Sequence, residues 1–483
     1  MRHTLAVLAL LISTALALQV SNVKLTQVSA VFFNLTCNTD QAASIYVQYW
    51  PTGGNYADTL AWKSLPSVSG TSHTLFLSRL YDTTTYNYAI KRRIFNTVLS
   101  QGTFATTALP TTLQAVHVSV LSGTPDQNDL NLASFSDFSN QGGNYPYIWN
   151  NKGRIVWYLH EPVNFPAFGL AQEIVGNSIF VNAVTELKEY KPWGTLVKSG
   201  KTDGCPNFHH ELHLNPGQQQ QSLYTLNYEF TTANGQDQLG DTFAKWDLNS
   251  NTVQIVGKTS DYFDPTTDRT TDSNAGIFTG YWPCTKVNVT APQDWTHGNA
   301  LTQSWPSGKY LVYSSRSLST VLIIDQSNPG TYYYVGGTKS SFTFPNAADK
   351  FSVQHTPHIT QDYSSTILLT VFDNGVTQAY SRALTLSLNL NTMQATKLWD
   401  YRLSTNPNCL GNFTGSVYPM LSGDYLVNFP TCNWNFQNPG TSYTVRLNSN
   451  GQEKWIYSHV KDNLFFNYRT NPSYGPIAGE TLA

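Results

Sequence analysis

The chain has 483 residues and a formal net charge of −2, with only 12% charged residues but 13% aromatic residues. Its length exceeds that of one typical domain, which favours two domains or one large repeat fold. The near-neutral charge and the lack of a Lys/Arg cluster argue against a nucleic-acid or anionic-membrane partner. Few charges together with many Tyr, Trp and Thr residues are typical of extracellular β-structure.

The first residues predict a secretory signal peptide over residues 1–18. MRHTLAVLALLISTALALQ has a basic start, a short apolar core and an Ala-Leu-Ala ending. The apolar run is shorter than the roughly 20 residues that a membrane-spanning helix needs. We therefore expect a secreted protein without a membrane partner.

Secretion would permit disulfides and N-linked glycans. The cysteine count is odd, so at least one is free or paired between chains: Cys37, Cys205, Cys284, Cys409 and Cys432. Cys409 and Cys432 lie near each other in a loop-rich region and are the predicted disulfide pair. Three Asn-X-Thr sequons are candidate glycosylation sites: Asn34, Asn288 and Asn412.

Residues 19–109 predict a small β-sandwich. Short alternating runs, such as VKLTQVSAVFFNLTC and ASIYVQYWP, are separated by turn residues. The stretch LYDTTTYNY at residues 80–88 is similar to the tyrosine-bearing corner of fibronectin-like domains. TTALPTT at residues 106–112 is typical of a linker, so we expect a second domain over residues 113–483.

A repeated pattern governs this second domain. A strand, a polar turn and a second strand, often carrying Trp or Tyr, recur about 40–75 residues apart. The six copies are residues 147–159, 187–199, 243–257, 321–336, 386–401 and 443–458. A turn and a buried strand precede most copies, and two hairpins per repeat make a four-stranded blade. The predicted fold is all-β, a six-bladed β-propeller preceded by a small fibronectin-like β-sandwich. A long sandwich or two stacked barrels would not explain the recurrence.

Three histidines share one position in the repeat. His210, His297 and His355 are each followed four residues later by Leu or Ile. The innermost strand of each blade lines the central channel, so these imidazoles should converge at one channel end. Asn299 would lie beside His297, and Arg316 ends the neighbouring strand and could reach back.

Other histidines lie close to these three in sequence. His209, His213 and His358 are expected to orient their neighbours or to face away. Alternation along a strand predicts that His209 and His210 point to opposite faces. A single histidine on a strand is more often a hydrogen-bonded filler than a catalyst.

Three imidazoles, an amide and a guanidinium suit an anionic substrate. Three histidines could hold zinc or copper, but Arg316 would repel a cation. Arginine forks onto anionic oxygens, and a neutral imidazole can serve as a nucleophile. These residue types favour transfer of an anionic group, phosphoryl or sulfuryl, through a histidine adduct, and they do not choose between the two groups.

The segments FHHEL, DWTHGNAL, LVYSSR, VLIIDQ, QHTPHIT and LLTVFDNG resemble the aryl-sulfate sulfotransferase family. The resemblance spans about residues 113–460 and implies transfer of a sulfuryl group from a phenolic sulfate ester to a phenol acceptor, without a nucleotide donor or cofactor. By motif, His355 would accept the sulfuryl group, whereas Asn299, His297 and Arg316 would bind the sulfate. One member of the histidine pair completes the set. The repeat selects His210 as catalytic and leaves His209 as a substrate-binding candidate.

We therefore expect neutral His355 to attack sulfur and expel a phenolate, and the second phenol then to take the group in a ping-pong course. Four groups would stabilise the developing charge: Arg316, Asn299, His210 and His297. A different class of function is a non-catalytic secreted propeller that binds sulfated or phenolic ligands. A metal-dependent sulfatase or phosphatase is a further alternative.

Overall fold

The structure is a computed structural model. It describes residues 18–472 apart from 54–61, 127–128, 138–144, 162–171, 176–177, 203–206, 215–221, 269–277, 280–292, 364, 433–439 and 462–464. The described chain is all-β, with one four-residue α-helix, α2 (Thr111–Gln114), and two three-residue 3-10 turns. Among its described helical segments, none has the length and apolar character needed to cross a membrane. The expected signal peptide, apart from its last residue, lies outside the described residues.

The chain divides into two compact units, the first ending at Pro110 and the second beginning at Thr111. The first unit contains two antiparallel sheets. One sheet has the order β1-β2-β5, with β1 (Val20–Ser29), β2 (Phe32–Ala43) and β5 (Gly70–Leu77). The other has the order β4-β3-β6-β7, with β3 (Ile45–Pro51), β4 (Trp62–Lys63), β6 (Thr85–Arg92) and β7 (Val98–Ala105).

A buried tyrosine fixes one corner of the first unit. The Tyr86 hydroxyl accepts a hydrogen bond of 2.7 Å from the backbone N–H of Tyr81, five residues upstream. The Tyr86 ring stacks on Phe104 with 5.3 Å between centroids. These contacts join the start of β6 to the preceding turn and to β7.

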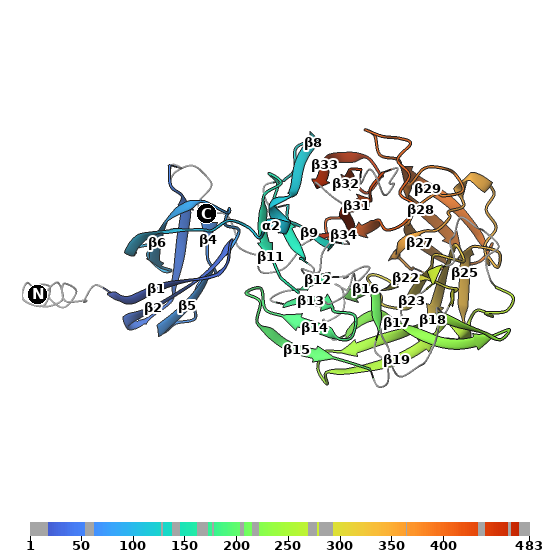
Figure 1. Ribbon diagram of the computed structural model, residues 1–483, viewed down its shortest axis with the longest axis horizontal. Helices are drawn as coiled ribbons and strands as arrows, with labels where there is room; N and C mark the ends of the chain where they lie inside the picture. The colour runs from blue at the N-terminus through green and yellow to red at the C-terminus, as the bar shows by residue number, and fades with distance from the viewer. Residues whose placement is uncertain are drawn as a thin grey trace, which may run out of the picture. The chain divides into compact units, whose positions relative to one another are not determined.

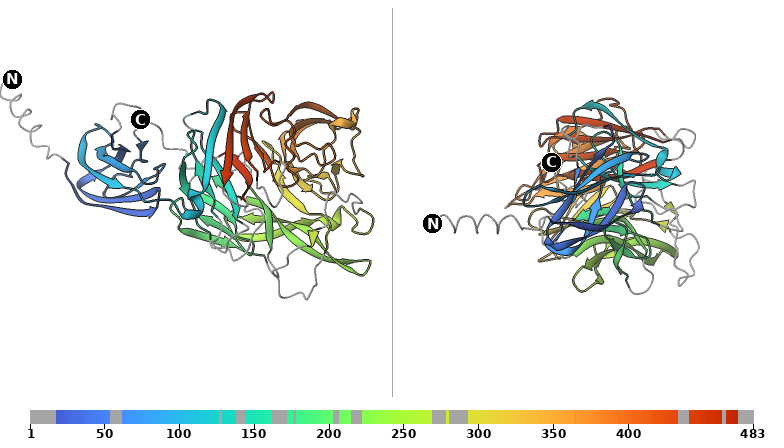
Figure 2. Two further views of the ribbon diagram at one scale, coloured as in Figure 1. Left: turned by 45° about the horizontal axis from the view of Figure 1, so that its top comes forward. Right: turned by 90° about the vertical axis from the view of Figure 1, so that its left-hand side faces the viewer.

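Six sheets form the described part of the second unit (Figure 1, Figure 2). The first contains β9 (Asn131–Asp137), β10 (Tyr147–Trp149), β11 (Ile155–Tyr158) and β34 (Phe465–Pro472). The second contains β12 (Gln172–Val175), β13 (Ser178–Asn182), β14 (Leu187–Tyr190) and β15 (Leu196–Gly200). The third contains β16 (Phe208–Leu214), β17 (Ser222–Ala233), β18 (Gln236–Asp247) and β19 (Thr252–Lys258), with the short β20 (Phe278–Thr279) and β21 (Gln293–Asp294).

The remaining three sheets follow in chain order. The fourth contains β22 (Gly298–Gln303), β23 (Tyr310–Ser315), β24 (Thr320–Asp325) and β25 (Tyr332–Gly336). The fifth contains β26 (His355–Gln361), β27 (Thr366–Asp373), β28 (Arg382–Asn389) and β29 (Gln394–Tyr401). The sixth contains β30 (Ser416–Pro419), β31 (Tyr425–Phe429), β32 (Ser442–Leu447), β33 (Glu453–Lys461) and β8 (Val116–Gly123). All six predicted hairpins are antiparallel strand pairs.

The leading strands of neighbouring sheets contact one another. The contacts run from β12 to β16, β22, β26, β30 and β34, and these six strands are called the inner strands below. The first and last strands of the unit each join the sheet from the other end of its chain. The C-terminal strand β34 pairs with β9 in the first sheet, and the N-terminal strand β8 pairs with β33 in the sixth. Such pairing ties the first and last sheets of the unit together through strands from both ends of its chain.

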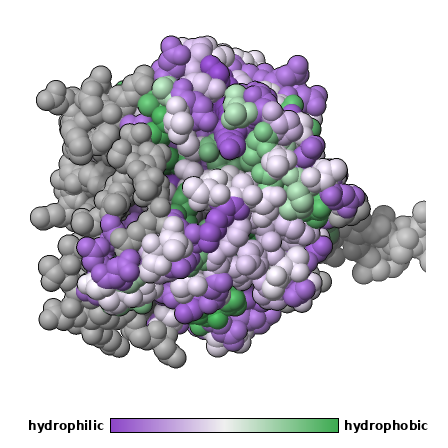
Figure 3. Space-filling view, turned by 90° about the vertical axis from the view of Figure 1, so that its right-hand side faces the viewer, coloured by the Kyte–Doolittle hydropathy of each residue, from purple (hydrophilic) through white to green (hydrophobic). Residues whose placement is uncertain are grey.

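Apolar residues fill the spaces between sheets. Val312 and Val321 of the fourth sheet pack with Leu369 and Leu384 of the fifth, and all four are fully buried. Each such side chain contributes about 1.5–3 kcal/mol by leaving water. On the face drawn in Figure 3, hydrophobic residues are limited to patches among hydrophilic ones. The cores therefore lie between the sheets and fix the positions of the inner strands.

Candidate active site

The predicted histidines lie at the beginnings of three inner strands. His210 is in β16, His297 directly precedes β22, and His355 is the first residue of β26. The rings of His210 and His297 are 5.1 Å apart between centroids. Burial lowers the pKa of His355 well below its usual value, and the charges of Arg316, Arg469 and His297 lower it further. The structure thus brings His210, His297, His355 and Arg316 into one site.

A strained backbone recurs at this end of the inner strands. His210, His297, Thr356 and Thr414 have left-handed φ angles of 58°, 44°, 44° and 63°. Non-glycine residues seldom adopt such angles, which cost of order 1–3 kcal/mol each and cluster at functional sites. The pairing register shifts at the start of β16, β22 and β26. Each of these strands therefore begins irregularly, and simple alternation does not hold there.

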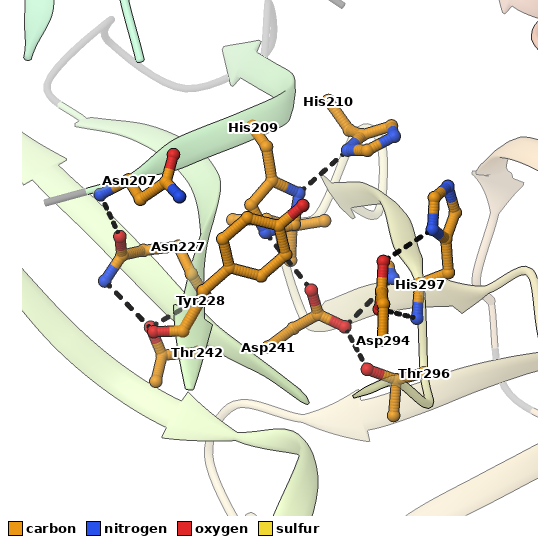
Figure 4. Close-up of polar contacts among 12 residues, drawn as sticks. Asn207, His209, His210, Asn227, Tyr228, Asp241, Thr242, Asp294, Thr296 and His297 are labelled. Carbon is orange, nitrogen blue, oxygen red and sulfur yellow. Dashed lines mark hydrogen bonds and ion pairs between the residues drawn. The ribbon is translucent and has the colours of Figure 1, made fainter. Parts of the chain in front are cut away.

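The prediction that His209 and His210 face opposite sides of β16 is wrong. Their Nδ1 atoms are 2.8 Å apart, and their rings are perpendicular with centroids 5.0 Å apart. Figure 4 shows the two imidazoles side by side. The left-handed conformation of His210 changes the direction of its side chain, so both histidines point into the same region.

His209 connects His210 to a buried carboxylate on β18. Its Nε2 is 3.2 Å from Oδ1 of Asp241, and its ring stacks on Tyr228 with 4.1 Å between centroids (Figure 4). Three further donors bond to Asp241 Oδ2, namely the Thr296 hydroxyl, the Tyr313 hydroxyl and the Gly298 backbone N–H. Burial opposes ionisation of Asp241, but hydrogen bonds from His209 and the two hydroxyls prevail and lower its pKa. Asp241 is therefore a carboxylate, which can only accept hydrogen bonds from its neighbours.

This chain of contacts limits the possible tautomers. Because Asp241 only accepts, Nε2 of His209 carries a hydrogen, and one further hydrogen is shared between the Nδ1 atoms of His209 and His210. If His209 is neutral, His210 donates from Nδ1 and its Nε2 is an acceptor. If His209 is protonated, Nε2 of His210 becomes a donor. The proton on His209 thus decides whether His210 offers a hydrogen or a lone pair.

His297 has its own acidic partner. Its Nδ1 is 2.6 Å from Oδ2 of Asp294, and its backbone N–H donates to Oδ1 of the same residue at 2.9 Å (Figure 4). Asp294 is buried, whereas His297 keeps 16% of its side chain exposed. Because the carboxylate binds Nδ1–H, Nε2 of His297 lies on the opposite side of the ring.

The ring of His355 is held in one tautomer by Asn374, which follows β27. Its Nδ1 is 2.7 Å from Oδ1 of Asn374. The Asn374 amide nitrogen donates to the carbonyls of Gly411 and Thr414, so the amide oxygen must face His355. Nδ1 therefore carries the hydrogen. Nε2 carries the lone pair, to which the Thr414 backbone N–H donates at 3.2 Å.

Arg316 and Asn299 are also buried, and both bind backbone carbonyls. Nη2 of Arg316 donates to the Asn412 carbonyl at 3.2 Å. The Asn299 amide nitrogen donates to the Gln354 carbonyl at 2.7 Å and so fastens β22 to the chain before β26. The Asn299 amide oxygen is buried without a hydrogen-bond partner among the described residues.

Sequence analysis missed a second arginine, Arg469 of β34. It is 2% exposed, and its Nη1 lies 2.7 Å from Oε2 of Glu211 in β16. Its Nη2 also donates to the Asn299 carbonyl. Burial raises the pKa of Glu211, and Arg469 opposes that shift. Arg469 thus joins three inner strands and adds positive charge beneath the histidines, as its effect on the pKa values of His210 and His355 shows.

Cys409 and Cys432 form a disulfide, which confirms that predicted pair. The chain between them includes Gly411, Asn412 and Thr414, whose backbones contact Asn374, Arg316 and His355. Cys37 is a buried free cysteine. Two cysteines and one sequon lie outside the described residues, namely Cys205, Cys284 and Asn288. Of the other sequons, Asn34 is half-buried in β2 and Asn412 is exposed.

His213 and His358 do not join the predicted set. They lie three residues after His210 and His355 in the same strands, and their rings approach each other with 5.5 Å between centroids. Among the residues that the structure describes, no cluster of three or more His, Cys, Asp or Glu side chains is arranged to hold a metal ion.

The neutral imidazole of His355, the neighbouring histidines and two arginines lie at one end of the inner strands, and this set suits an enzyme that acts on an anionic group. The chain belongs to the arylsulfotransferase (ASST) family, whose sequence model matches residues 117–469. Membership indicates an aryl-sulfate sulfotransferase that acts on small aryl substrates.

Other comparisons are more distant. None of the curated proteins matches this sequence. A Bacteroides caccae protein of unknown function is similar at 13% identity and a TM-score of 0.37, over 72% of this chain and 99% of that one. The Neurospora crassa Pan2 WD40 domain is similar at 10% identity and a TM-score of 0.32, over 73% of this chain and 92% of that one.

Proposed function

We propose that this protein transfers a sulfuryl group from a phenolic sulfate ester to a phenol through a sulfohistidine at His355. The hydrogen-bond pattern around His355 carries the proposal. Asn374 accepts from Nδ1, so Nε2 carries the lone pair, and the Thr414 N–H that donates to it must move to a sulfuryl oxygen as Nε2 attacks. Burial and nearby positive charge keep the imidazole neutral, as a nucleophile requires.

In the first half-reaction, Nε2 of His355 forms a bond to sulfur while the bond from sulfur to the phenolic oxygen breaks. The electron pair of that bond leaves with the phenolate. Arg316 and the Thr414 N–H lie beside His355 and donate to the sulfuryl oxygens. Preorganised donors of this kind are typically worth about 2.7–4 kcal/mol each in the transition state.

The pair of His209 and Asp241 supplies the proton for the leaving group. With His209 protonated, Nε2–H of His210 donates to the departing phenolate oxygen. As that proton leaves, the hydrogen on Nδ1 of His209 moves to Nδ1 of His210, and His209 becomes neutral beside Asp241. The phenol departs uncharged, and the carboxylate balances the positive charge of the resting pair.

The second half-reaction reverses these steps with the acceptor phenol. Its oxygen attacks sulfur as the bond to Nε2 breaks, and its hydroxyl proton passes through His210 to His209. His355 returns to its neutral tautomer. Donor and acceptor use the same residues in turn, which is a ping-pong course.

We extend the proposal to the architecture and the compartment. The six sheets with their inner strands support a six-bladed β-propeller over residues 113–483. The two sheets of the first unit and the bond of Tyr86 to Tyr81 support a fibronectin-like β-sandwich over residues 19–109. The N-terminal sequence and the disulfide support secretion, for which Asn34, Asn288 and Asn412 remain glycosylation candidates.

A non-catalytic binder of sulfated or phenolic ligands is the competing function. Binding alone does not require a histidine locked as a neutral nucleophile or a second histidine joined to a buried carboxylate. The purified protein is incubated with 4-nitrophenyl sulfate, with and without phenol, and nitrophenolate release is recorded. We expect release that rises with phenol in the wild type and is lost in His355→Asn. No release under any acceptor would favour the binder, and loss of release with a chelator would favour a metal-dependent hydrolase.

A further inference from the structure

A cavity lies toward the opposite ends of the inner strands. Its lining includes His213 at the end of β16, Gln303 at the end of β22, His358 in β26 and Tyr418 in β30. The atom-free space is about 590 Å³, including the part open to solvent. Because the histidines of the active site lie at the beginnings of the same strands, the two sites occupy opposite ends of the ring.

The floor of this cavity carries unsatisfied hydrogen-bonding atoms. His213 and His358 are only 7% and 3% exposed. Nε2 of each ring has no hydrogen-bond partner among the described residues. His213 donates to the Gln303 carbonyl, and this hydrogen must come from Nδ1 because Nε2 is unpartnered. Nε2 of His213 therefore presents a buried lone pair that requires a hydrogen-bond donor. A buried acceptor without a hydrogen bond lowers the stability of the protein.

The electrostatics disfavour a metal ion as the occupant. Burial lowers the pKa of His213 to about 3 and that of His358 well below its usual value, and Arg469 lowers both further. Both rings are therefore neutral. The charge of Arg469 disfavours a divalent cation beside them, although its ion pair with Glu211 reduces this effect, whereas a neutral hydroxyl meets no such repulsion.

The remaining walls are largely apolar. Trp305, Ile359, Met420 and Leu421 surround the floor together with the Tyr418 ring, which lies 5.0 Å from the His358 ring between centroids. A cavity with apolar walls and a few convergent polar atoms is typical of a small-molecule site. Flat aromatic rings pack well against such walls.

We propose that this cavity binds an uncharged phenol, with the hydroxyl donating to Nε2 of His213 beside His358 and the aromatic ring between Trp305 and Met420. The site is separate from the reaction, since His213 lies three positions after His210 and His358 lies three positions after His355 along the same strands. The inference concerns binding alone and does not rest on the proposed transfer reaction.

The direct test is a crystal of the full chain soaked in 4-bromophenol. We expect an anomalous bromine peak in the cavity and a phenol oxygen within hydrogen-bond distance of His213. Density for the bromine only elsewhere on the protein would overturn the proposal. So would a zinc or copper ion that occupies the two imidazoles after the same crystals are soaked in either metal.

Equilibrium dialysis with 4-bromophenol tests the site in solution. The double variant His213→Phe/His358→Phe keeps the ring shapes but removes the acceptors, and it should bind one equivalent less than the wild type. His117→Phe, on the exposed side of β8, makes the same chemical change away from the cavity and should bind as the wild type does. Met420→Trp, which fills the cavity from its half-buried rim, provides a second test if the double variant does not fold. Equal stoichiometry in the wild type and in a folded cavity variant would refute the site, whatever the outcome of the turnover assay.

Discussion

Replacing Asn374 by Asp tests how the structure keeps His355 nucleophilic. Asn374 accepts from Nδ1 of His355 at 2.7 Å without carrying charge. An aspartate would place a negative charge about 4 Å from the ring centre, worth about 4 kcal/mol at an effective dielectric constant of about 20. At 1.36 kcal/mol per unit, the pKa of His355 would rise by about three units.

The consequence is a shift of the pH profile in a defined direction. In the wild type the pKa of His355 is depressed, so the neutral form persists as pH falls and the rate of the first half-reaction stays flat from about pH 6 to 9. In Asn374→Asp, protonation begins at a pH about three units higher. The rate should then fall about tenfold per pH unit below the new pKa.

The assay is the pre-steady-state burst of nitrophenolate without an acceptor, measured by stopped flow at several pH values. Asn389→Asp, at the end of β28, introduces the same charge at a turn where the side chain only accepts from backbone amides. This control should follow the wild-type profile. An Asn374→Asp profile that matches the wild type would refute the role assigned to Asn374. A wild-type rate that falls near pH 6.5 would show that His355 has an ordinary pKa.

Three further variants test separate parts of the structure. Asp241→Asn should remove the proton donor for the leaving group. Transfer from sulfate esters of weakly acidic phenols should therefore slow far more than transfer from 4-nitrophenyl sulfate. Transfer rates across a series of aryl sulfates measure this difference. Glu211→Gln leaves Arg469 buried without its partner and should lower the free energy of unfolding by about 3–5 kcal/mol in urea titrations. Cys409→Ser/Cys432→Ser should cost about 3 kcal/mol by the same method, since the disulfide spans 23 residues.

Matched substitutions serve as controls. Asp237→Asn lies on the same strand as Asp241 but is only half-buried, and it should leave the dependence on the leaving group unchanged. Lys454→Met breaks an ion pair whose lysine is 47% exposed, and it should cost less than about 1 kcal/mol. A uniform loss of rate for all esters in Asp241→Asn would contradict the proton-donor role. A cost for Glu211→Gln as small as that of Lys454→Met would contradict the buried pair.

Repetition in the sequence was sufficient to predict the strand pairs and the grouping of the histidines. Each hairpin carries its own turn residues and alternation, so its strands can be recognised locally. His210, His297 and His355 share one position in the repeat, and the structure places them together. The directions of individual side chains were less predictable. Strand alternation fails at His210 because its backbone is left-handed, which alternation does not reveal.

The partners of these histidines were harder to predict, because each comes from a distant part of the chain. Asp241 lies on β18, 32 positions after His209, in a run with no visible motif. Arg469 is on the last strand, and it reaches Glu211 only because β34 completes the first sheet. Asn374 had a usable signal in the sequence. The motif FDNG comes at the end of a predicted buried strand, and the strand that carries His355 begins at the same end of the sheet. Loops after such strands carry functional polar groups more often than the strands themselves.

The most direct test of the mechanism is to trap the enzyme between its half-reactions. The protein is mixed with excess 4-nitrophenyl sulfate without a phenol, quenched in alkali and digested, and its peptides are analysed by mass spectrometry. We predict that the peptide containing His355 gains the mass of one sulfuryl group, in step with one equivalent of nitrophenolate, and that phenol removes it. A wild-type enzyme that turns over steadily while this peptide stays unmodified, or a His355→Asn variant that retains transfer, would contradict a covalent intermediate at His355.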